Sequence, residues 1–228
     1  MRRLAIDTSS LACTVALQLD DRLIERYEEQ EREHTRLLMP MIRETLDEAG
    51  VCVKNLDAIV LGNGPGSFIG MRIAASVAQG LAHGAGIDVV PVSSLAAVAA
   101  EVFELCDAEV VAVAQDAHMS EVYLGLFARG LDGLPSPICE ERLHGVGEIA
   151  EIEKRNAGGV VAAGYGWIRY PEQLTANAAY LPQGPSVLYP KAKFLLRLSE
   201  SQPAISPQRI EPAYLRQKVA EKSRPKVA

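Results

Sequence analysis

The stretch that decides the fold is LDAIVLGNGPGSFIGMRI, which spans residues 56–73. Its apolar beginning, residues 56–61, predicts a short buried strand, and the four glycines and one proline of residues 62–70 require a tight loop. Small and apolar residues then predict a helix from about Ser67 to His83, ended by Gly84. A strand, a glycine-rich loop and a helix in this order favour an α/β architecture.

Upstream of this stretch, the sequence predicts three strands followed by one helix. Short runs rich in apolar and β-branched residues predict the strands at residues 3–8, 13–19 and 22–27. The Asp20-Asp21 pair predicts the turn of an antiparallel hairpin. Apolar residues then recur at helical spacing from Leu37 to Ala49, and Gly50 stops the helix. Pro40 is expected to open this helix or to kink its first turns.

Downstream, strands and helices alternate again. Strands are predicted at residues 88–92, 109–114, 121–127 and 160–163, and helices at residues 94–105 and 192–199. This order predicts two α/β lobes rather than one doubly wound sheet. We expect an N-terminal lobe over residues 1–105 and a C-terminal lobe over residues 106–228. No repeat is visible in the sequence, so any topology that the lobes share is structural only.

The composition is typical of a soluble globular protein. Of the 228 residues, 48% are hydrophobic and 23% are charged, which excludes a largely disordered chain. No apolar run approaches the ~18 residues of a membrane span, and the apolar run after Met1 is too short for a secretory signal. A cytoplasmic protein is therefore expected. The net charge of −6 divides into a basic tail, residues 209–228, with a net charge of +4, and a body near −10.

A polar cluster, Asp7-Thr8-Ser9, ends the first predicted strand and is the best candidate for a nucleotide site. A carboxylate and hydroxyls on such a turn can hold Mg²⁺ and phosphates. The alternative is a polar turn with Asx-type side-chain bonds. The glycine-rich loop does not decide between these readings, because it lacks the lysine of a phosphate-binding P-loop and the acidic partner of a dinucleotide fingerprint.

The sequence offers no other metal-binding or catalytic residue. The histidines and cysteines lack metal-ligand spacing, so no metal site is predicted, and the four cysteines are expected to be small buried hydrophobes. His118 lies in the polar loop 116–121, but neighbours in sequence rarely take up triad geometry. No serine sits in a GxSxG elbow. The catalytic set is therefore predicted to be empty.

Two helices have more apolar or small surface than one core face needs. In the helix after the glycine-rich loop, small residues fall four apart at Gly70, Ala74, Ala78 and Ala82, which lets another helix backbone come close. The helix over residues 37–49 has two adjoining apolar stripes. These surfaces either bind a partner or pack within the same lobe, and the pattern alone leaves both readings open.

Several segments in chain order carry recognisable motifs: Ile6–Ser9, His34–Ile42, Gly64–Ile73, Pro91–Leu95, Asp116–Tyr123 and Pro212–Arg216. Together they resemble the TsaB (YeaZ) family over nearly the whole chain. The GPGSF element is the most specific of them. It departs from the family at Ile69, which replaces a threonine, and at Ala74, which replaces a glycine.

The resemblance implies an actin-like (ASKHA, ribonuclease H-like) α/β fold with two similar lobes. It also implies a role in making N6-threonylcarbamoyladenosine at the tRNA adenosine beside the anticodon. The chain would be a non-catalytic scaffold that supports a TsaD-type catalytic subunit, with a TsaE-type ATPase joining the assembly. Alone, it would form a homodimer. Contact with tRNA would be made through the complex, without a membrane, and direct tRNA binding by the basic tail is a weaker possibility.

Catalytic relatives carry a paired-histidine metal motif, and residues 93–98 of this chain contain no histidine. The resemblance therefore implies no enzymatic activity and no cofactor of its own, with ATP and Mg²⁺ held at most at the partner junction. The rival hypothesis is an ATP-binding actin-like kinase or hydrolase. It would use Asp7, Thr8 and Ser9 as a phosphate loop, with Asp116 as the acid of the second lobe and Gly164-Tyr165-Gly166 as the adenosine turn.

In the family the first two long helices mediate self-association and partner docking, which agrees with their unusual surfaces here. The candidate interface residues are Leu37, Leu38, Met41, Ile42, Gly70, Met71, Arg72, Ala74, Ala75 and Ala78. Because the small-residue stripe motivates this interface, Ala74→Arg or Ala78→Arg is expected to abolish association while the lobe still folds.

Overall fold

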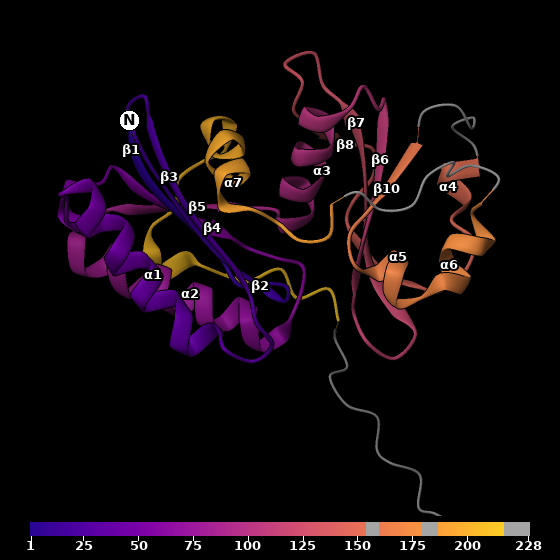
Figure 1. Ribbon diagram of the computed structural model, residues 1–228, viewed down its shortest axis with the longest axis horizontal. Helices are drawn as coiled ribbons and strands as arrows, with labels where there is room; N and C mark the ends of the chain where they lie inside the picture. Colours follow the sequence, from indigo (N-terminus) through magenta and orange to yellow (C-terminus); the bar gives the residue numbers. More distant parts are fainter. Residues whose placement is uncertain (154–159, 179–186, 217–228) are drawn as a thin grey trace, which may run out of the picture.

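The structure is a computed structural model, and it describes residues 1–153, 160–178 and 187–216. Two lobes lie side by side, each built around one sheet (Figure 1). Residues 217–228, most of the predicted basic tail, lie outside the described residues. No helix in the described part of the chain is long and apolar enough to cross a membrane.

The first sheet has the strand order β3-β2-β1-β4-β5. Its strands are β1 (Arg2–Asp7), β2 (Ala12–Leu19), β3 (Arg22–Glu29), β4 (Ala58–Gly62) and β5 (Asp88–Val92). β1, β2 and β3 form an antiparallel meander with an Asp20-Asp21 turn, whereas β4 pairs parallel to β1 and β5 parallel to β4. The predicted hairpin and strands are confirmed here, with bounds shifted by one or two residues.

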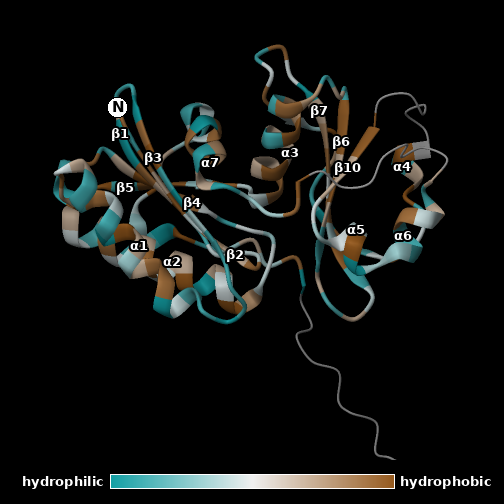
Figure 2. Cartoon of the chain, viewed as in Figure 1, coloured by the Kyte–Doolittle hydropathy of each residue, from teal (hydrophilic) through white to brown (hydrophobic). Residues whose placement is uncertain are grey.

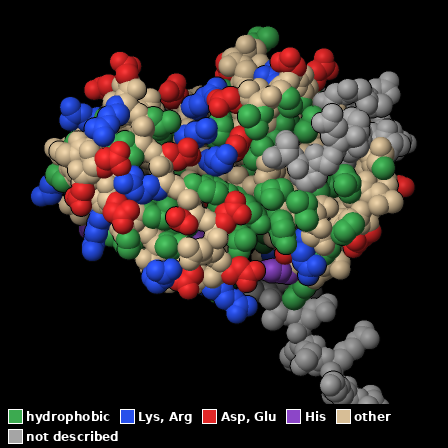
Figure 3. Space-filling model, in the orientation of Figure 1, with side chains coloured by type: hydrophobic (Ala, Val, Ile, Leu, Met, Phe, Trp, Pro, Cys, Tyr) green, Lys and Arg blue, Asp and Glu red, His purple; other side chains and the backbone are tan. Residues whose placement is uncertain are grey.

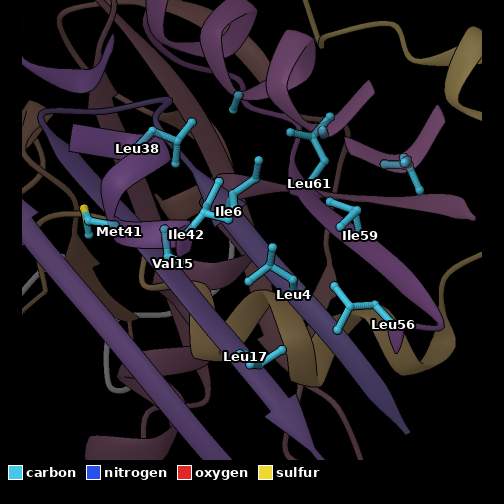
Figure 4. Close-up of a cluster of buried hydrophobic side chains, with 14 of the residues drawn as sticks. Leu4, Ile6, Val15, Leu17, Leu38, Met41, Ile42, Leu56, Ile59 and Leu61 are labelled. Carbon is cyan, nitrogen blue, oxygen red and sulfur yellow. The ribbon is translucent and has the colours of Figure 1, made fainter. Parts of the chain in front are cut away.

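Helices cover both faces of the first sheet. Side chains such as Leu4, Ile6 and Ile59 pack against α1 (His34–Ala49) and α2 (Phe68–Ala85), as Figure 4 shows for α1. Their neighbours in the strands face the other way, toward α7 (Ala192–Leu198). Since both faces are buried, the central strands are apolar throughout, as expected for a covered sheet.

The second sheet has the strand order β10-β6-β7-β8, and β9 also pairs with β7. Its strands are β6 (Val110–Asp116), β7 (Glu121–Arg129), β8 (Pro135–Pro137), β9 (Arg142–Gly145) and β10 (Val160–Ala163). One face packs against α3 (Ser94–Leu105), which lies between the lobes. The other face packs near the short helices α4 (Ala150–Glu153), α5 (Gly166–Arg169) and α6 (Pro171–Ala176). β10 is uniformly hydrophobic, whereas α1 has hydrophilic and hydrophobic parts (Figure 2).

The two sheets share a topology. In each, the first strand pairs antiparallel with the next one along the chain and parallel with a later one, giving β2-β1-β4 in the first sheet and β7-β6-β10 in the second. In each, the first strand ends at an aspartate, Asp7 or Asp116. The repeat that is invisible in the sequence is therefore present in the strand order.

Three sequence predictions need correction. α1 begins at His34, so Pro40 lies inside the helix instead of opening it, and α2 runs through Gly84 to a left-handed cap at Gly86. The expectation that all four cysteines are buried is wrong, because Cys52 and Cys106 are exposed.

The segment after residue 191 returns to the first lobe. α7 packs on the first sheet, and Ile205 forms an isolated antiparallel bridge with Val89 of β5. The predicted division at residues 105 and 106 separates the strands of the two sheets but does not describe this return. We call residues 205–216 the C-terminal strap, because Arg216 then reaches the β6–β7 hairpin of the second lobe.

Candidate partner surface and the Asp7 turn

The polar residues at the end of β1 form a closed turn. The Ser9 amide donates to Asp7 Oδ1 at 2.6 Å, and the Ser94 hydroxyl donates to Asp7 Oδ2 at 2.6 Å. Both carboxylate oxygens are therefore occupied by groups of the chain itself. This is the Asx-type arrangement that the alternative sequence reading described.

The glycine-rich loop lies directly on this turn. The Ser67 amide donates to the Ser9 carbonyl at 2.6 Å, and the Thr8 hydroxyl donates to the Gly70 carbonyl at 2.7 Å. A Cβ atom at Gly66 would lie 2.1 Å from the Ser9 carbonyl oxygen, and one at Gly70 would lie 1.9 Å from that of Thr8. These glycines are needed because two backbone segments meet without room for side chains.

The structure thus brings together the three predicted nucleotide-binding residues but buries them. Asp7 and Thr8 are 0% exposed and Ser9 is 3% exposed. Burial raises the pKa of Asp7 above its usual range, although hydrogen bonds from Ser94 and Ser9 oppose the rise. A nucleotide could reach this carboxylate only if the glycine-rich loop moved. Nucleotide binding by this chain stays a prediction.

The equivalent turn in the second lobe is more open. The His118 amide donates to Asp116 Oδ1 at 2.7 Å, and the Tyr170 hydroxyl donates to the same oxygen at 2.9 Å. The Asp116 side chain is 16% exposed, and His118 Nδ1 lies 3.2 Å from Asp116 Oδ2. His118, Met119 and Ser120 all have positive φ, so the hairpin tip is strained.

The described residues hold no group of three or more histidine, cysteine, aspartate or glutamate side chains placed to bind a metal ion. The glycine turn of the rival hypothesis packs on β6, because a Cβ atom at Gly164 would lie 2.2 Å from the Ala114 carbonyl oxygen.

The small-residue stripe of α2 faces its own sheet. Ala74, Ala78 and Ala82 are 0% exposed, and they pack in the core that α1 and α2 make with the first sheet. Gly70 is buried on Thr8. The second sequence reading, packing within the same lobe, therefore describes this stripe. Because Ala74 and Ala78 are fully buried, we now expect Ala74→Arg or Ala78→Arg to unfold the lobe, in place of the folded, dissociated chain expected from the sequence.

Most of the other predicted interface residues are buried, like the small-residue stripe. Leu38, Met41 and Ile42 point from α1 toward the strands (Figure 4), and Met71 and Ala75 are 3% and 9% exposed. Leu37 is half-buried, and Arg72 is exposed. Of the predicted set, these last two side chains are the most available to a partner.

The side of α2 that faces away from the sheet was missed from the sequence. We call it the outward row, and it comprises Ile69, Ile73, Ser76, Gly80 and Gly84. Ile69 is 70% exposed, Ile73 is half-buried, and the other three are exposed. The spacing of four, three, four and four residues keeps them on one helix face, as in a helix–helix seam.

Three elements flank the outward row, and one of them, η1 (Val53–Asn55), borders it at Gly80 and Gly84. α1 lies beside α2 on the same face of the sheet (Figure 1). On its other side the C-terminal strap contacts α2, since Gln79 Nε2 donates to the Pro207 carbonyl at 3.0 Å and Arg72 Nε donates to the Tyr214 hydroxyl at 3.0 Å. Among the described residues, the outward row is exposed at Ile69, Ser76, Gly80 and Gly84, whereas Ile73 packs partly against the core.

Steric contacts in the described part of the chain do not require the two glycines of the outward row. A Cβ atom at Gly80 or Gly84 would meet nothing within 4 Å. Glycine inside a helix costs about 1 kcal/mol relative to alanine. A shallow hollow of about 370 Å³ adjoins them, with the mostly apolar lining Cys52, Val53, Lys54, Gly80, Leu81, Gly84 and Ala85. Such a surface suits the close approach of another helix.

The outward row is also poor in charge. Of the exposed residues of α2, only Arg72 carries a permanent charge. Elsewhere on the first lobe, acidic and basic side chains alternate across the face seen in Figure 3. The contrast marks the outward row as a surface that is unlike the ordinary solvated surface of the lobe.

Comparison with known proteins gives two kinds of match in sequence. The family model of TsaD, described as tRNA N6-adenosine threonylcarbamoyltransferase, matches residues 25–163. The tRNA threonylcarbamoyladenosine biosynthesis protein TsaB of Haemophilus influenzae is 36% identical, covering 97% of this chain and 96% of that protein. The protein of the same name from Escherichia coli is 34% identical over 99% of both chains.

Solved structures agree with these matches. A crystal structure of a Pseudomonas aeruginosa protein, described as uncharacterized with similarity to peptidase YEAZ, superposes with a TM-score of 0.81 at 36% identity. YeaZ from the same organism superposes with a TM-score of 0.80 at 35% identity. Each covers 94% of this chain and 99% of the solved chain. The match therefore includes both lobes.

Proposed function

Because this chain belongs to the TsaB family, has the two-lobed actin-like ASKHA fold, and takes part in threonylcarbamoyladenosine biosynthesis on tRNA, we propose that it works as a docking subunit. In this proposal it binds a TsaD-type catalytic subunit through the outward row of α2. It contributes no catalytic residue, and a TsaE-type ATPase joins the assembly in the cytoplasm. The free chain uses the same face to form a homodimer.

The single observation that supports docking most strongly is the outward row itself. It places exposed Ile69 and half-buried Ile73 in line with the uncovered glycines Gly80 and Gly84. Leaving large apolar side chains in water and glycines inside a helix both lower the stability of the free chain. A partner helix packed on the outward row would bury the apolar side chains and occupy the space above the glycines.

The closed Asp7 turn supports the non-catalytic part of the proposal. The Asp7 carboxylate is 0% exposed and is hydrogen-bonded to Ser94 and Ser9. A side chain that is already paired inside the fold is a poor candidate for holding Mg²⁺ or phosphate. We therefore propose that any nucleotide in the assembly is held by other subunits or at their junction with this chain.

Ser76→Arg tests the docking surface. Ser76 is exposed in the middle of the outward row, so the variant should fold normally, as measured by circular dichroism and thermal unfolding. A charge buried without a partner in an interface costs 3–5 kcal/mol, so binding to the purified TsaD-type subunit should weaken by roughly 100-fold or more. Size-exclusion chromatography with mass measurement should also show loss of the homodimer.

Two further variants control this test. Ser201→Arg introduces the same side chain at an exposed site next to α7, on the other face of the sheet, and should bind like the wild type. Ala74→Arg should fail to fold, because Ala74 is 0% exposed against the first sheet. Normal partner affinity for folded Ser76→Arg would mean that the outward row is not the docking surface.

A further inference from the structure

Arg72 stands at the edge of the outward row in an aromatic clamp. Its guanidinium carbon lies 3.7 Å from the centroid of the Phe68 ring and 5.6 Å from that of the Tyr214 ring. The two rings are 5.6 Å apart and inclined by 48°. Nε donates to the Tyr214 hydroxyl at 3.0 Å. One aromatic contact and one hydrogen bond therefore set the plane of an exposed guanidinium.

The strap holds Tyr214 in place from both sides. Before it, the Ala213 amide donates to the Asn63 carbonyl at 3.1 Å, and Asn63 Nδ2 donates to the Glu211 carbonyl at 3.0 Å. After it, Arg216 Nη2 donates to the Ala117 carbonyl at 2.8 Å in the second lobe. Tyr214 is thus anchored to both lobes although its side chain is 43% exposed.

The clamp leaves the outer edge of the guanidinium without a partner. Among the described residues, no carboxylate lies within ion-pair distance of Arg72, and neither Nη1 nor Nη2 donates a hydrogen bond. These two nitrogens carry four N–H donors in one plane, which matches the geometry of a carboxylate. Fixing the side chain in advance lowers the ordering cost of binding.

We propose that Arg72 is a preformed receptor for a carboxylate side chain of the partner that docks on the outward row, with Phe68 and Tyr214 as its positioning residues. This inference rests on the proposed function, since it assumes that a protein covers α2. It adds the chemical nature of one contact across the interface. The partner places an aspartate or glutamate beside Ile69, where the outward row meets the strap.

The position favours an energetically important contact. Arginine and tyrosine are frequent among the residues that dominate interface energies, particularly beside apolar side chains that exclude water. Here exposed Ile69 precedes Arg72 by three residues, so the two lie on neighbouring positions of the helix surface. Docking on Ile69 and Ile73 would shield the Arg72 pair from solvent and strengthen it.

The test measures binding of the purified TsaD-type subunit to four variants at several salt concentrations. Arg72→Ala should weaken binding by roughly tenfold or more and lower its salt dependence. Arg72→Lys keeps the charge but loses the planar fork, so most of the loss should remain. Tyr214→Phe keeps the ring but not the hydroxyl, and should weaken binding a few-fold. Arg197→Ala, which removes an arginine of α7 on the other face of the sheet, should have no effect.

The outcomes separate this inference from the proposed function. If Arg72→Ala binds within twofold of the wild type while Ser76→Arg does not bind, the docking surface stands and the carboxylate receptor is wrong. If Arg72→Lys binds like the wild type, the planar fork has no role, and the inference also fails. If Arg72→Ala weakens binding while Ser76→Arg leaves it unchanged, the partner contacts Arg72 without covering the outward row. The proposed docking surface is then wrong, and the inference that assumes it fails as well. Unchanged binding in both would contradict both proposals.

Discussion

At the residue scale, Glu141 is a half-buried carboxyl group at the contact between the lobes. It lies between β8 and β9, and it accepts a hydrogen bond from Ser93, the N-cap residue of α3. Burial raises the pKa of Glu141 to about 7, although the Ser93 bond opposes the rise. The ordinary value is 4.5, so the folded chain holds this proton more tightly than the unfolded chain does.

Glu141 should therefore make stability depend on pH. Its contribution is complete below pH 4.5 and is lost as the pH rises to about 7. Glu141→Gln removes the charge and keeps an acceptor for Ser93. At pH 8 its free energy of unfolding should exceed that of the wild type by up to about 3 kcal/mol.

Urea unfolding at pH 4.5, 6 and 8 measures this difference. The gap between Glu141→Gln and the wild type should open between pH 4.5 and pH 7 and then stay constant. Glu140→Gln, at the exposed neighbouring position, should show no such gap. A gap that is as large at pH 4.5 as at pH 8 would mean that the Glu141 charge is not its source.

The Asp7 turn shows which features of a site can be predicted from the local sequence and which cannot. The sequence placed Asp7, Thr8 and Ser9 together at a strand end, and the structure confirms that they meet there. Their burial depends on Ser94 and Gly70, which are more than 60 residues away. A local pattern contains no information on such contacts, so the choice between a phosphate loop and a closed turn stayed open.

At the element scale, α2 carries glycines in two opposite environments, which gives a matched pair of substitutions. Both Gly70→Ala and Gly80→Ala replace a helix glycine, and alanine is intrinsically better by about 1 kcal/mol. Gly80→Ala should realise this gain, because its Cβ meets nothing within 4 Å. Gly70→Ala should instead destabilise the chain by 1–3 kcal/mol or more, because its Cβ would lie 1.9 Å from the Thr8 carbonyl oxygen.

Thermal or urea unfolding of both variants checks the pair. The midpoints should move in opposite directions from that of the wild type. If both variants are stabilised, Thr8 and α2 are not in the close contact that closes the Asp7 turn, and the turn is then open enough for a nucleotide.

The composition of α2 also explains why the buried small-residue stripe was predicted as the partner surface. Small residues occur on both sides of α2: Ala74 and Ala78 are buried, whereas Ser76 and Gly80 are exposed. Periodicity therefore predicted the helix but not its rotation about its axis. That rotation depends on tertiary contacts, among them the contact of Gly70 with Thr8 and the packing of Ala74 and Ala78 in the core. The sequence did contain one clue to the exposed side. Alanine fits a packed core and favours a helix, whereas Gly80 and Gly84 destabilise a helix.

At the scale of the whole molecule, the order of strands and helices was sufficient to predict two α/β lobes. The sequence did not reveal that α7 and the strap return to the first lobe after the second sheet. Nothing local distinguishes a helix that packs on one sheet from a helix that packs on the other. The strap matters because it places Tyr214 beside Arg72 and Arg216 at the β6–β7 hairpin.

The whole molecule is thus a two-lobed subunit whose first-lobe Asp7 turn is closed and whose most unusual surface is an uncovered helix face. This division supports the proposal that a partner carries out the chemistry and that this chain provides a docking surface. It also predicts that damage to the Asp7 turn acts through folding, whereas damage to the outward row acts through assembly.

A decisive measurement is threonylcarbamoyladenosine formation on tRNA by the TsaD-type and TsaE-type subunits, supplied with ATP and an activated threonylcarbamoyl donor. The reaction is run with the wild-type chain, with folded Ser76→Arg, or without this chain. Of these three reactions, only the one that contains the wild-type chain should form product. This chain should form no product when the TsaD-type subunit is left out. Full activity with Ser76→Arg, or product formed by this chain by itself, would contradict the proposed function.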